Sequence, residues 1–212
     1  MTMLLLLVVF LASAWGDSSF SYESSICRLG EPILRSICDP VAISSILHKD
    51  SALFADVSKA HAVLLDFNRK KGFGRAISSC QVGSTKAFIA MRVNKEGEPE
   101  RVTLFNPRIV ARSAETFTMY DDCLSFEDLM VCVRRAKRVS VAFTDEDGQE
   151  QIWRKCSQAT SELLQHEIDH LAGVLAMDRA EDPIRGAGMA VVKRAEYLER
   201  KAFYDGLVDY AI

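Results

Sequence analysis

The segment QHEIDHLAGV (165–174) contains two histidines four positions apart, with a glutamate directly after the first. Residues at this spacing lie one turn apart on the same face of an α-helix, so a helix here would direct both imidazoles toward one point. Such a pair can hold a divalent metal ion, and the glutamate can reach a water molecule beside it. The same residues also fit an ordinary amphipathic helix, so a metal site requires a third ligand elsewhere in the chain.

The third ligand does not come from the residues that directly follow. A longer pattern, H-E-x-x-H-x-x-G-x-x-H, would supply a third histidine, but Ala176 stands at that position. The remaining histidines, His48 and His61, fit ordinary surface or core positions. Cys123 in YDDCLSF is the better candidate, because a thiolate and two imidazoles leave the fourth position of a tetrahedral site for water. The alternative is that Cys123 is a buried strand cysteine.

Helical spacing of apolar residues marks three parts of the sequence. Residues 51–70 predict a first helix that ends near Gly72. Residues 157–173, which include both histidines, predict a second helix. A last helix is expected over 188–205. Its packing face would comprise Ala195, Leu198 and Phe203.

The centre of the chain predicts strands. Three are expected over 87–93, 101–110 with an interruption at Pro107, and 115–126, followed by a hairpin over 130–156 that turns at Asp147-Gly148. The order of helix, antiparallel strands, helix and helix favours an α+β fold. We expect one domain over residues 30–205, in which antiparallel strands pack around a central metal-binding helix, with further helices on its N-terminal and C-terminal sides.

Composition limits the classes of partner. Hydrophobic residues make up 49% and charged residues 26% of the 212 residues, and the formal net charge is -3. This composition is typical of a soluble folded domain and gives no electrostatic reason to expect direct nucleic-acid binding. The six cysteines form no CxxC pair. Buried free thiols are therefore expected, with disulfides as the alternative.

The first fifteen residues, MTMLLLLVVFLASAW, are almost entirely apolar. They are too few for a bilayer span, which needs about 20 apolar residues, and they resemble a signal-peptide core followed by small residues. The expected positive region is absent, since the first basic residue is Arg28. We interpret residues 1–20 as a targeting segment or presequence and expect no stable membrane anchor in the mature form. A mis-assigned start and an accessory hydrophobic anchor are the alternatives.

Three ordered segments resemble the motifs of the peptide deformylase family. QHEIDH (165–170) is similar to the family pattern Q-H-E-x-D-H, DDCLS (121–125) to E-G-C-Φ-S, where Φ is hydrophobic, and GRAISSCQVG (74–83) to G-x-G-Φ-A-A-x-Q. NPRI (106–109) and VRRAKRV (133–139) also match family segments. The resemblance covers about residues 30–180, and it implies an enzyme that hydrolyses the formyl group from N-formylmethionine.

The resemblance also implies roles for individual residues. The metal, Fe²⁺ in most of the family with Zn²⁺ or another divalent ion as alternatives, would be bound once per chain by Cys123, His166 and His170. Glu167 would take a proton from the metal-bound water and pass it to the leaving amine. The oxyanion would be stabilised by the Gln81 side chain and the Leu124 backbone N–H. Substrate contacts would come from Gly74, Ala76 and Asp122, and Asp121 would pair with Arg135.

The chain departs from the family pattern around the site. Ala76 replaces a glycine, Ser78-Ser79 replaces Ala-Ala, Asp122 replaces the glycine before the metal ligand, and Asp121 replaces a glutamate. Two functional states are consistent with these changes: an active deformylase with altered peptide preference, and a metal-binding paralogue with weak activity. A metallopeptidase of another H-E-x-x-H class and a non-catalytic binding module are the further alternatives.

Substrate and compartment follow from the resemblance alone. The substrate would be the N-formylmethionyl end of a nascent polypeptide, with the ribosome as a further partner. Formylmethionine starts translation in organelles, so the expected location is a mitochondrion. Because the start of the chain is more like a secretory signal, a plastid reached by that route is the alternative.

Overall fold

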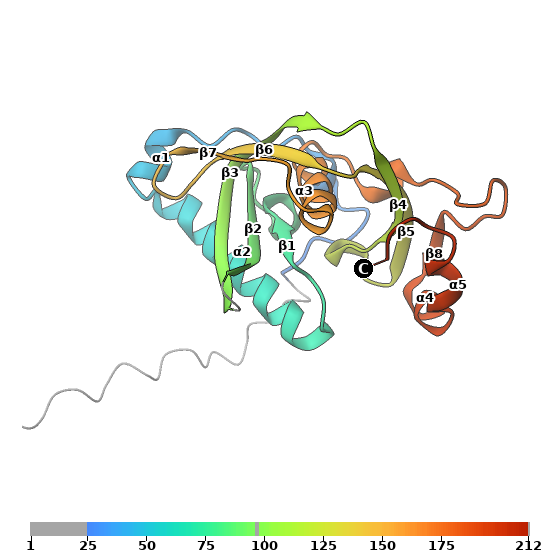
Figure 1. Cartoon of the computed structure of the whole chain (residues 1–212). Helices are drawn as coiled ribbons and strands as arrows, with labels where there is room; N and C mark the ends of the chain where they lie inside the picture. The colour runs from blue at the N-terminus through green and yellow to red at the C-terminus, as the bar shows by residue number, and fades with distance from the viewer. Residues whose placement is uncertain (1–24, 96–97, 212) are drawn as a thin grey trace, which may run out of the picture.

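The computed structural model describes residues 25–95 and 98–211, so the predicted targeting segment lies outside the described residues. The helices and strands follow the predicted α+β order, with antiparallel pairing between the strands (Figure 1). The five-stranded sheet contains β1 (Ala76–Ser78), β2 (Phe88–Lys95), β3 (Glu98–Arg112), β6 (Val139–Thr144) and β7 (Glu150–Trp153), in the order β1-β2-β3-β6-β7. The three-stranded sheet contains β4 (Thr116–Asp121), β5 (Leu129–Ala136) and β8 (Val191–Lys193), in the order β4-β5-β8.

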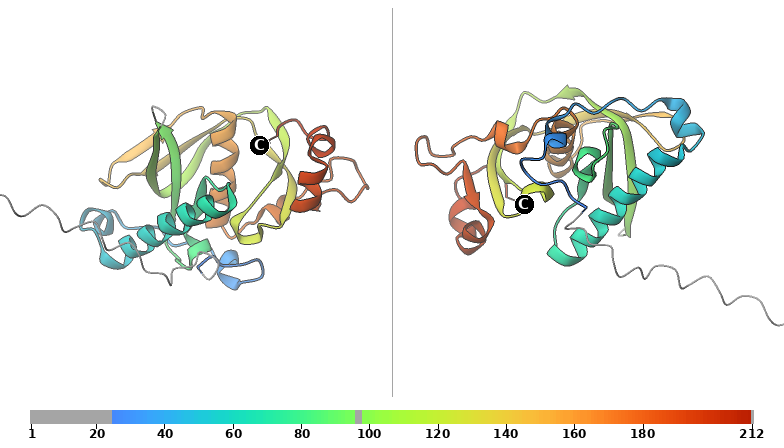
Figure 2. Two further views of the ribbon diagram at one scale, coloured as in Figure 1. Left: turned by 90° about the horizontal axis from the view of Figure 1, so that it is seen from below. Right: turned by 180° about the vertical axis from the view of Figure 1, so that it is seen from behind.

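The helices are α1 (Ile43–Leu47), α2 (Ser51–Lys71), α3 (Gln158–Leu171), α4 (Arg194–Glu199) and α5 (Lys201–Asp205). The described residues also contain four short 3₁₀ segments: η2 (Pro32–Arg35), η3 (Ser79–Val82), η4 (Leu124–Phe126) and η5 (Ala176–Arg179). In the two further views, α2 lies along one side of the larger sheet and α4 and α5 lie beyond the smaller one (Figure 2). Among the described residues, no helix has both the length and the apolar character needed to cross a membrane.

Helix α2 forms where the sequence predicted it. Its start is fixed by Asp50, whose side chain accepts a hydrogen bond from the Leu53 backbone N–H, and its end by Gly72 at φ 80. The predicted apolar face is buried against the larger sheet, where Val57 and Leu64 join a cluster with Phe88. Burial of that face holds the helix on the sheet.

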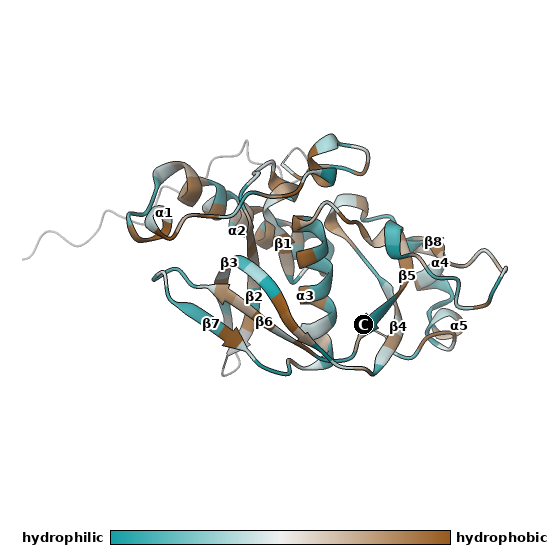
Figure 3. Cartoon of the chain, turned by 90° about the horizontal axis from the view of Figure 1, so that it is seen from above, coloured by the Kyte–Doolittle hydropathy of each residue, from teal (hydrophilic) through white to brown (hydrophobic). Residues whose placement is uncertain are grey.

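Helix α3 occupies the opposite face of the larger sheet and lies between the two sheets (Figure 1). Ser157 caps its start by accepting a hydrogen bond from the Thr160 backbone N–H. Figure 3 shows that the helix is of mixed hydropathy. Leu164 packs against the larger sheet, while several polar residues of the helix are also buried: Ser161, Glu162, Gln165, His166, Glu167 and His170. Buried polar groups need partners, and these partners form the site described below.

Two predictions about the strands were wrong in part. Residues 130–156 do not form one hairpin: β6 and β7 pair around the predicted turn, but β5 pairs with β4 and β8 in the other sheet. Strand β3 continues through Pro107, with a register shift between Phe105 and Arg108. Asn106, at φ 50, accounts for this shift, because its side chain hydrogen-bonds both backbone groups of Val41 and proline tolerates a bulge.

The predicted C-terminal helix over 188–205 was wrong in part: Arg194–Glu199 and Lys201–Asp205 are helical, as α4 and α5. Its start is the strand β8, which adds to β5, and α4 and α5 are separated at Arg200, whose φ and ψ are -115 and 31. The packing face differs as well. Leu198 and Phe203 are 56% and 39% exposed, whereas Tyr197 and Tyr204 are buried. Val191 and Val192 in β8 are β-branched, which favours a strand over a helix. The buried face of α4 and α5 is formed by the large rings of Tyr197 and Tyr204.

Candidate metal centre

Three potential ligands converge between the end of β4 and α3. Cys123 lies two positions after the end of β4, and His166 and His170 project from one face of α3. The Cys123 Sγ lies 3.3 Å from the His170 Nε2, and the two histidine Nε2 atoms are 3.1 Å apart. All three side chains are buried. The structure therefore brings together the three residues that the sequence predicted as ligands.

These residues fit a divalent ion. Ligands at the usual metal distances around a tetrahedral ion are separated by about 3.3–3.8 Å, close to the observed separations. Burial and the neighbouring His166 place the pKa of His170 well below its usual value, which favours the neutral imidazole that binds metal. Burial raises the pKa of the Cys123 thiol, so a cation is the group that would stabilise its thiolate here. A sulfur and two nitrogens suit zinc or iron better than magnesium or calcium.

Asp121 orients one of the histidines. Its Oδ2 lies 2.9 Å from His166 Nδ1 and accepts a hydrogen bond of 3.1 Å from Arg135. Burial raises the pKa of Asp121, but His166 and Arg135 outweigh burial and lower it to about 2. An ionised carboxylate at Nδ1 leaves Nε2 facing the site, which is the arrangement that carboxylate–histidine–metal sites use.

The acidic network continues along α3. Arg135 also donates to Asp169 at 2.5 Å, and Asp169 accepts two hydrogen bonds from Arg179. Arg135 is only 4% exposed, whereas Arg134 beside it is exposed. The predicted pair of Asp121 and Arg135 is thus in contact. The second carboxylate, Asp169, explains how a buried guanidinium is compensated.

Glu167 is buried, with 3% of its surface exposed. It lines the same cavity as Cys123 and His166. Its Oε2 accepts a hydrogen bond of 2.6 Å from the Ser78 hydroxyl. Burial raises the pKa of Glu167, while His166 and Ser78 act in the opposite direction. A buried carboxylate with a raised pKa is suited to proton transfer near neutral pH. The contact with Ser78 was not predicted, although the replacement of alanine by serine was visible in the sequence.

Gln81 is held in a defined orientation. Its side-chain oxygen accepts a hydrogen bond from the Ser78 backbone N–H at 2.9 Å, so its amide nitrogen points toward Ser125 Oγ at 3.1 Å and Cys123 Sγ at 3.5 Å. Leu124 is the first residue of η4, where a backbone N–H has no acceptor in a preceding turn. Both predicted donors therefore stand beside the ligands.

A cavity of about 330 Å³ gives access to this cluster. The predicted substrate contacts Gly74, Ala76 and Asp122 all line it. Gly74 has φ 95, a conformation that strains residues with a side chain. A Cβ there would also lie 3.3 Å from the Phe67 ring, which would have to shift slightly. Neither Ala76 nor Asp122 has a positive φ. The replacement of glycine at these two positions thus brings no left-handed backbone strain.

Charged residues that no motif identified also line this cavity. Arg194, from the start of α4, lies 2.8 Å from the Asp122 carboxylate, and its guanidinium is 3.7 Å from the centroid of the Phe73 ring. Arg75 forms an ion pair with Glu162. Burial raises the pKa of Glu162 to about 7, against the opposing effect of Arg75. In the sequence, Arg75, Glu162 and Arg194 differ from their neighbours only in charge. Charge alone does not indicate a functional site.

Comparison with known proteins places this geometry in a family. The model of the polypeptide deformylase family matches residues 23–185. The peptide deformylase of Rhizobium meliloti is 32% identical over 152 residues, which cover 71% of this chain and 80% of that protein.

Solved structures agree with the sequence match. A plant peptide deformylase superposes with a TM-score of 0.65 at 26% identity, covering 90% of this chain and 95% of that one. The Acinetobacter baumannii enzyme with Met-Ala-Ser bound gives a TM-score of 0.60 at 27% identity, over 73% of this chain and 96% of that one. The fold, the cysteine–histidine cluster and the sequence match lead to one conclusion: the chain belongs to the polypeptide deformylase family.

Proposed function

We propose that this protein removes the formyl group from the N-formylmethionyl end of newly made polypeptides, as a metal-dependent hydrolase. The observation that carries the proposal is the convergence of Cys123, His166 and His170. Cys123 and His166 line a cavity that Glu167 and Gln81 also line. Hydrolysis of an amide needs a nucleophilic water, a base and a stabilised oxyanion. This cavity holds candidates for each requirement.

Each residue has a part in the proposed reaction. Cys123, His166 and His170 would hold the ion, with Fe²⁺ as the proposed native metal and Zn²⁺ as a substitute. When bound, a divalent ion in such a site lowers the pKa of water toward neutrality and polarises a carbonyl group. Glu167 would take the proton from the attacking water at its carboxylate and deliver it to the leaving amine.

Two donors would stabilise the oxygen of the formyl group as it gains charge. The Gln81 amide nitrogen is oriented by the Ser78 backbone N–H, so it costs little to align in the transition state. The Leu124 backbone N–H would be the second donor. Gly74 and Ala76 would lie along the peptide, where the small side chains leave room for its backbone.

One observation favours weak or altered deformylase activity in this chain. The Asp122–Arg194 ion pair and the stacking of Arg194 on Phe73 connect the two walls of the cavity. A peptide that enters between these walls has to displace or pass this bridge. We infer that turnover of simple formyl-Met peptides is slower than in a chain with glycine at position 122.

The cellular setting is part of the proposal. We infer an organelle that starts translation with formylmethionine, a mitochondrion or, through a signal-peptide route, a plastid, with nascent chains at the ribosome as the source of substrate. The support is the apolar start of the sequence and the chemistry of the substrate. Imaging of the tagged full-length protein together with markers for both organelles would decide between them.

The central experiment measures formate release from formyl-Met-Ala-Ser by protein purified anaerobically with Fe²⁺. We expect turnover by the natural chain and none by Glu167→Gln, with the same metal content in both proteins. Turnover by Glu167→Gln at the natural rate would contradict the assigned base. Cleavage of internal peptide bonds without formate release would instead indicate a metallopeptidase of another class.

A further inference from the structure

A second cavity adjoins the one that contains the candidate metal centre. Its volume is about 620 Å³, within the usual range for a ligand pocket. The two cavities share the lining residues Asn68, Gly74, Arg75 and Leu163. A peptide that lies along Gly74 with its N-terminus at Glu167 would therefore continue into this second cavity.

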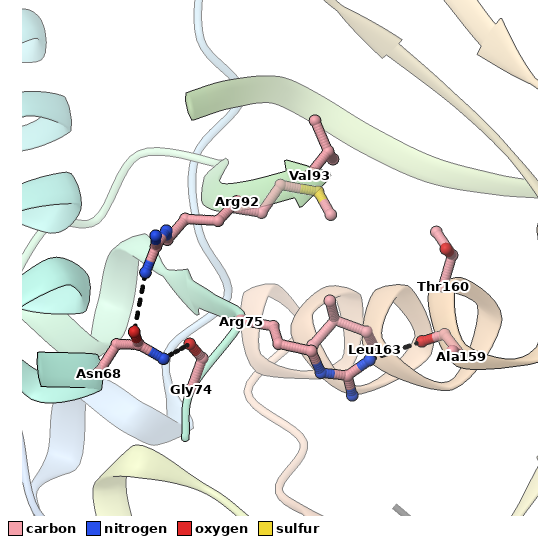
Figure 4. A pocket seen from close by; sticks show the side chains of 9 residues that line it. Asn68, Gly74, Arg75, Arg92, Val93, Ala159, Thr160 and Leu163 are labelled. Carbon is pink, nitrogen blue, oxygen red and sulfur yellow. Dashed lines mark hydrogen bonds between the residues drawn. The ribbon is translucent and has the colours of Figure 1, made fainter. Parts of the chain in front are cut away.

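The lining of the second cavity combines positive charge with apolar surface. Arg75 and Arg92 approach it from different sides, and Leu163 and Val93 form part of its wall (Figure 4). Within the described residues, no carboxylate lines this cavity. Two guanidinium groups without an acidic residue between them create a positive potential, which favours an anionic ligand.

The arginines are fixed in place before any ligand binds. Arg92 donates to the Asn68 side-chain oxygen at 2.8 Å, and the Asn68 amide nitrogen donates to the Gly74 carbonyl at 3.2 Å. The Arg92 backbone N–H donates to the Arg75 carbonyl at 2.9 Å. Asn68 thus connects Arg92 to the backbone that the substrate would follow. Groups held in this way lose little entropy when a ligand binds.

Most of the net positive charge comes from Arg92. Arg75 donates to the Ala159 carbonyl at 3.0 Å and pairs with Glu162, which lines the metal-site cavity and not the second one. Among the ion pairs of the described residues, none includes Arg92. A carboxylate in the cavity would therefore meet a guanidinium that forms no ion pair with another described side chain.

We propose that this cavity is a subsite for an acidic side chain on the second or third residue of the formylated peptide. The inference rests on the proposed function, since it assumes that the peptide N-terminus lies at Glu167. An aspartate or glutamate would place its carboxylate at the Arg92 guanidinium, which can form paired hydrogen bonds with it, and Arg75 would add to the positive potential. The methylene groups of that side chain would lie against Met91, Val93 and Leu163.

Pairs of peptides that differ only in charge test the proposal. The natural protein is assayed for kcat/KM with formyl-Met-Asp-Ser against formyl-Met-Asn-Ser, and with formyl-Met-Ala-Glu against formyl-Met-Ala-Gln. We expect the acidic member of at least one pair to be favoured by about 1.5- to 5-fold, the range for an exposed ion pair. The preference should decrease as salt is added.

Two variants with the same change of net charge locate the effect. Arg92→Gln should abolish the preference, because it removes the guanidinium from the cavity. Arg112→Gln, at an exposed position of β3 that does not line the cavity, should retain it. Equal kcat/KM values for the acidic and neutral peptides, or a preference that survives Arg92→Gln, would overturn the subsite.

The subsite and the proposed function can fail separately. If no peptide releases formate, the proposed function fails, and the subsite is then decided by calorimetry of Met-Asp-Ser and Met-Asn-Ser binding to the metal-loaded protein. Tighter binding of Met-Asp-Ser that Arg92→Gln removes would support the subsite. Binding of inorganic phosphate to the cavity, without any gain for the acidic peptides, would show a site for free anions and overturn a peptide subsite.

Discussion

The Asp122 carboxylate and the Arg194 guanidinium are 2.8 Å apart, although 72 positions separate them in the sequence. This contact joins the residue before the candidate ligand Cys123 to the first residue of α4. Arg194 also stacks on Phe73 across the cavity. The C-terminal part of the chain thus forms part of the wall of the site.

Removing this bridge is expected to increase activity. The ion pair and the stacking together contribute about 1–2 kcal/mol, so the double variant Asp122→Gly with Arg194→Met should raise kcat/KM for formyl-Met-Ala-Ser by about 5- to 30-fold. Steady-state formate release measures this effect. Arg200→Met, which alters an exposed arginine between α4 and α5, is the control and should leave kcat/KM unchanged. A decrease in the double variant would mean that Arg194 assists the substrate.

Asp121→Asn should weaken metal binding. The change keeps the shape of the side chain but removes the charge beside His166 Nδ1, and losses of this kind reduce metal affinity about 10- to 100-fold. Competition with a chromophoric chelator gives the dissociation constant. Asp122→Asn alters the neighbouring carboxylate, which pairs with Arg194 instead, and should keep the natural affinity. Equal affinities in both variants would argue against an orienting role for Asp121.

Gln81→Leu should lower kcat with little change in KM. The amide nitrogen that stands beside Cys123 would be lost, and removal of one oxyanion donor reduces kcat about 10²- to 10³-fold. Metal content should be retained, because Gln81 is not a predicted ligand. A matching rise in KM with unchanged kcat would show that Gln81 binds the ground state and not the transition state.

Protonation of His61 should make the protein less stable in mild acid. His61 is buried on α2, 2.9 Å from the Thr103 hydroxyl, and burial together with Arg101 lowers its pKa to about 4. The unfolded chain binds the proton near its ordinary pKa of about 6.5, so unfolding is favoured progressively as pH falls from 6.5 toward 4. The loss approaches about 3 kcal/mol.

Urea denaturation at several pH values measures this loss of unfolding free energy. His61→Gln should flatten the dependence between pH 6.5 and pH 4, whereas His48→Gln, at an exposed histidine, should preserve it. An unchanged slope in His61→Gln would assign the acid sensitivity to other groups.

Local signals in the sequence were sufficient for α2, α3 and the two candidate histidine ligands. Asp50 and Ser157 cap the two helices, and histidines one turn apart share a face in any α-helix. The third ligand, Cys123, could be placed only through the family resemblance, because its approach to α3 depends on long-range pairing of β4.

What the sequence did not predict is the pairing of distant segments. The turn at Asp147-Gly148 identified the β6–β7 hairpin, but no local residue indicates that β5 joins β8 instead of β6. The same limit applies to Arg194 and Glu162, whose partners lie far away in the sequence. A lone charged residue carries no information about its partner.

The position of α3 between the two sheets has a consequence for hydrogen exchange. Its amides can exchange with solvent only when the surrounding core opens, so they should be among the slowest in the molecule. Segment α4 is joined to the smaller sheet through the three-residue strand β8, and its amides should exchange much sooner. Arg194 therefore belongs to a part of the chain that can open locally, while the ligands on α3 stay protected. Arg194 would therefore move on a shorter timescale than His166 and His170.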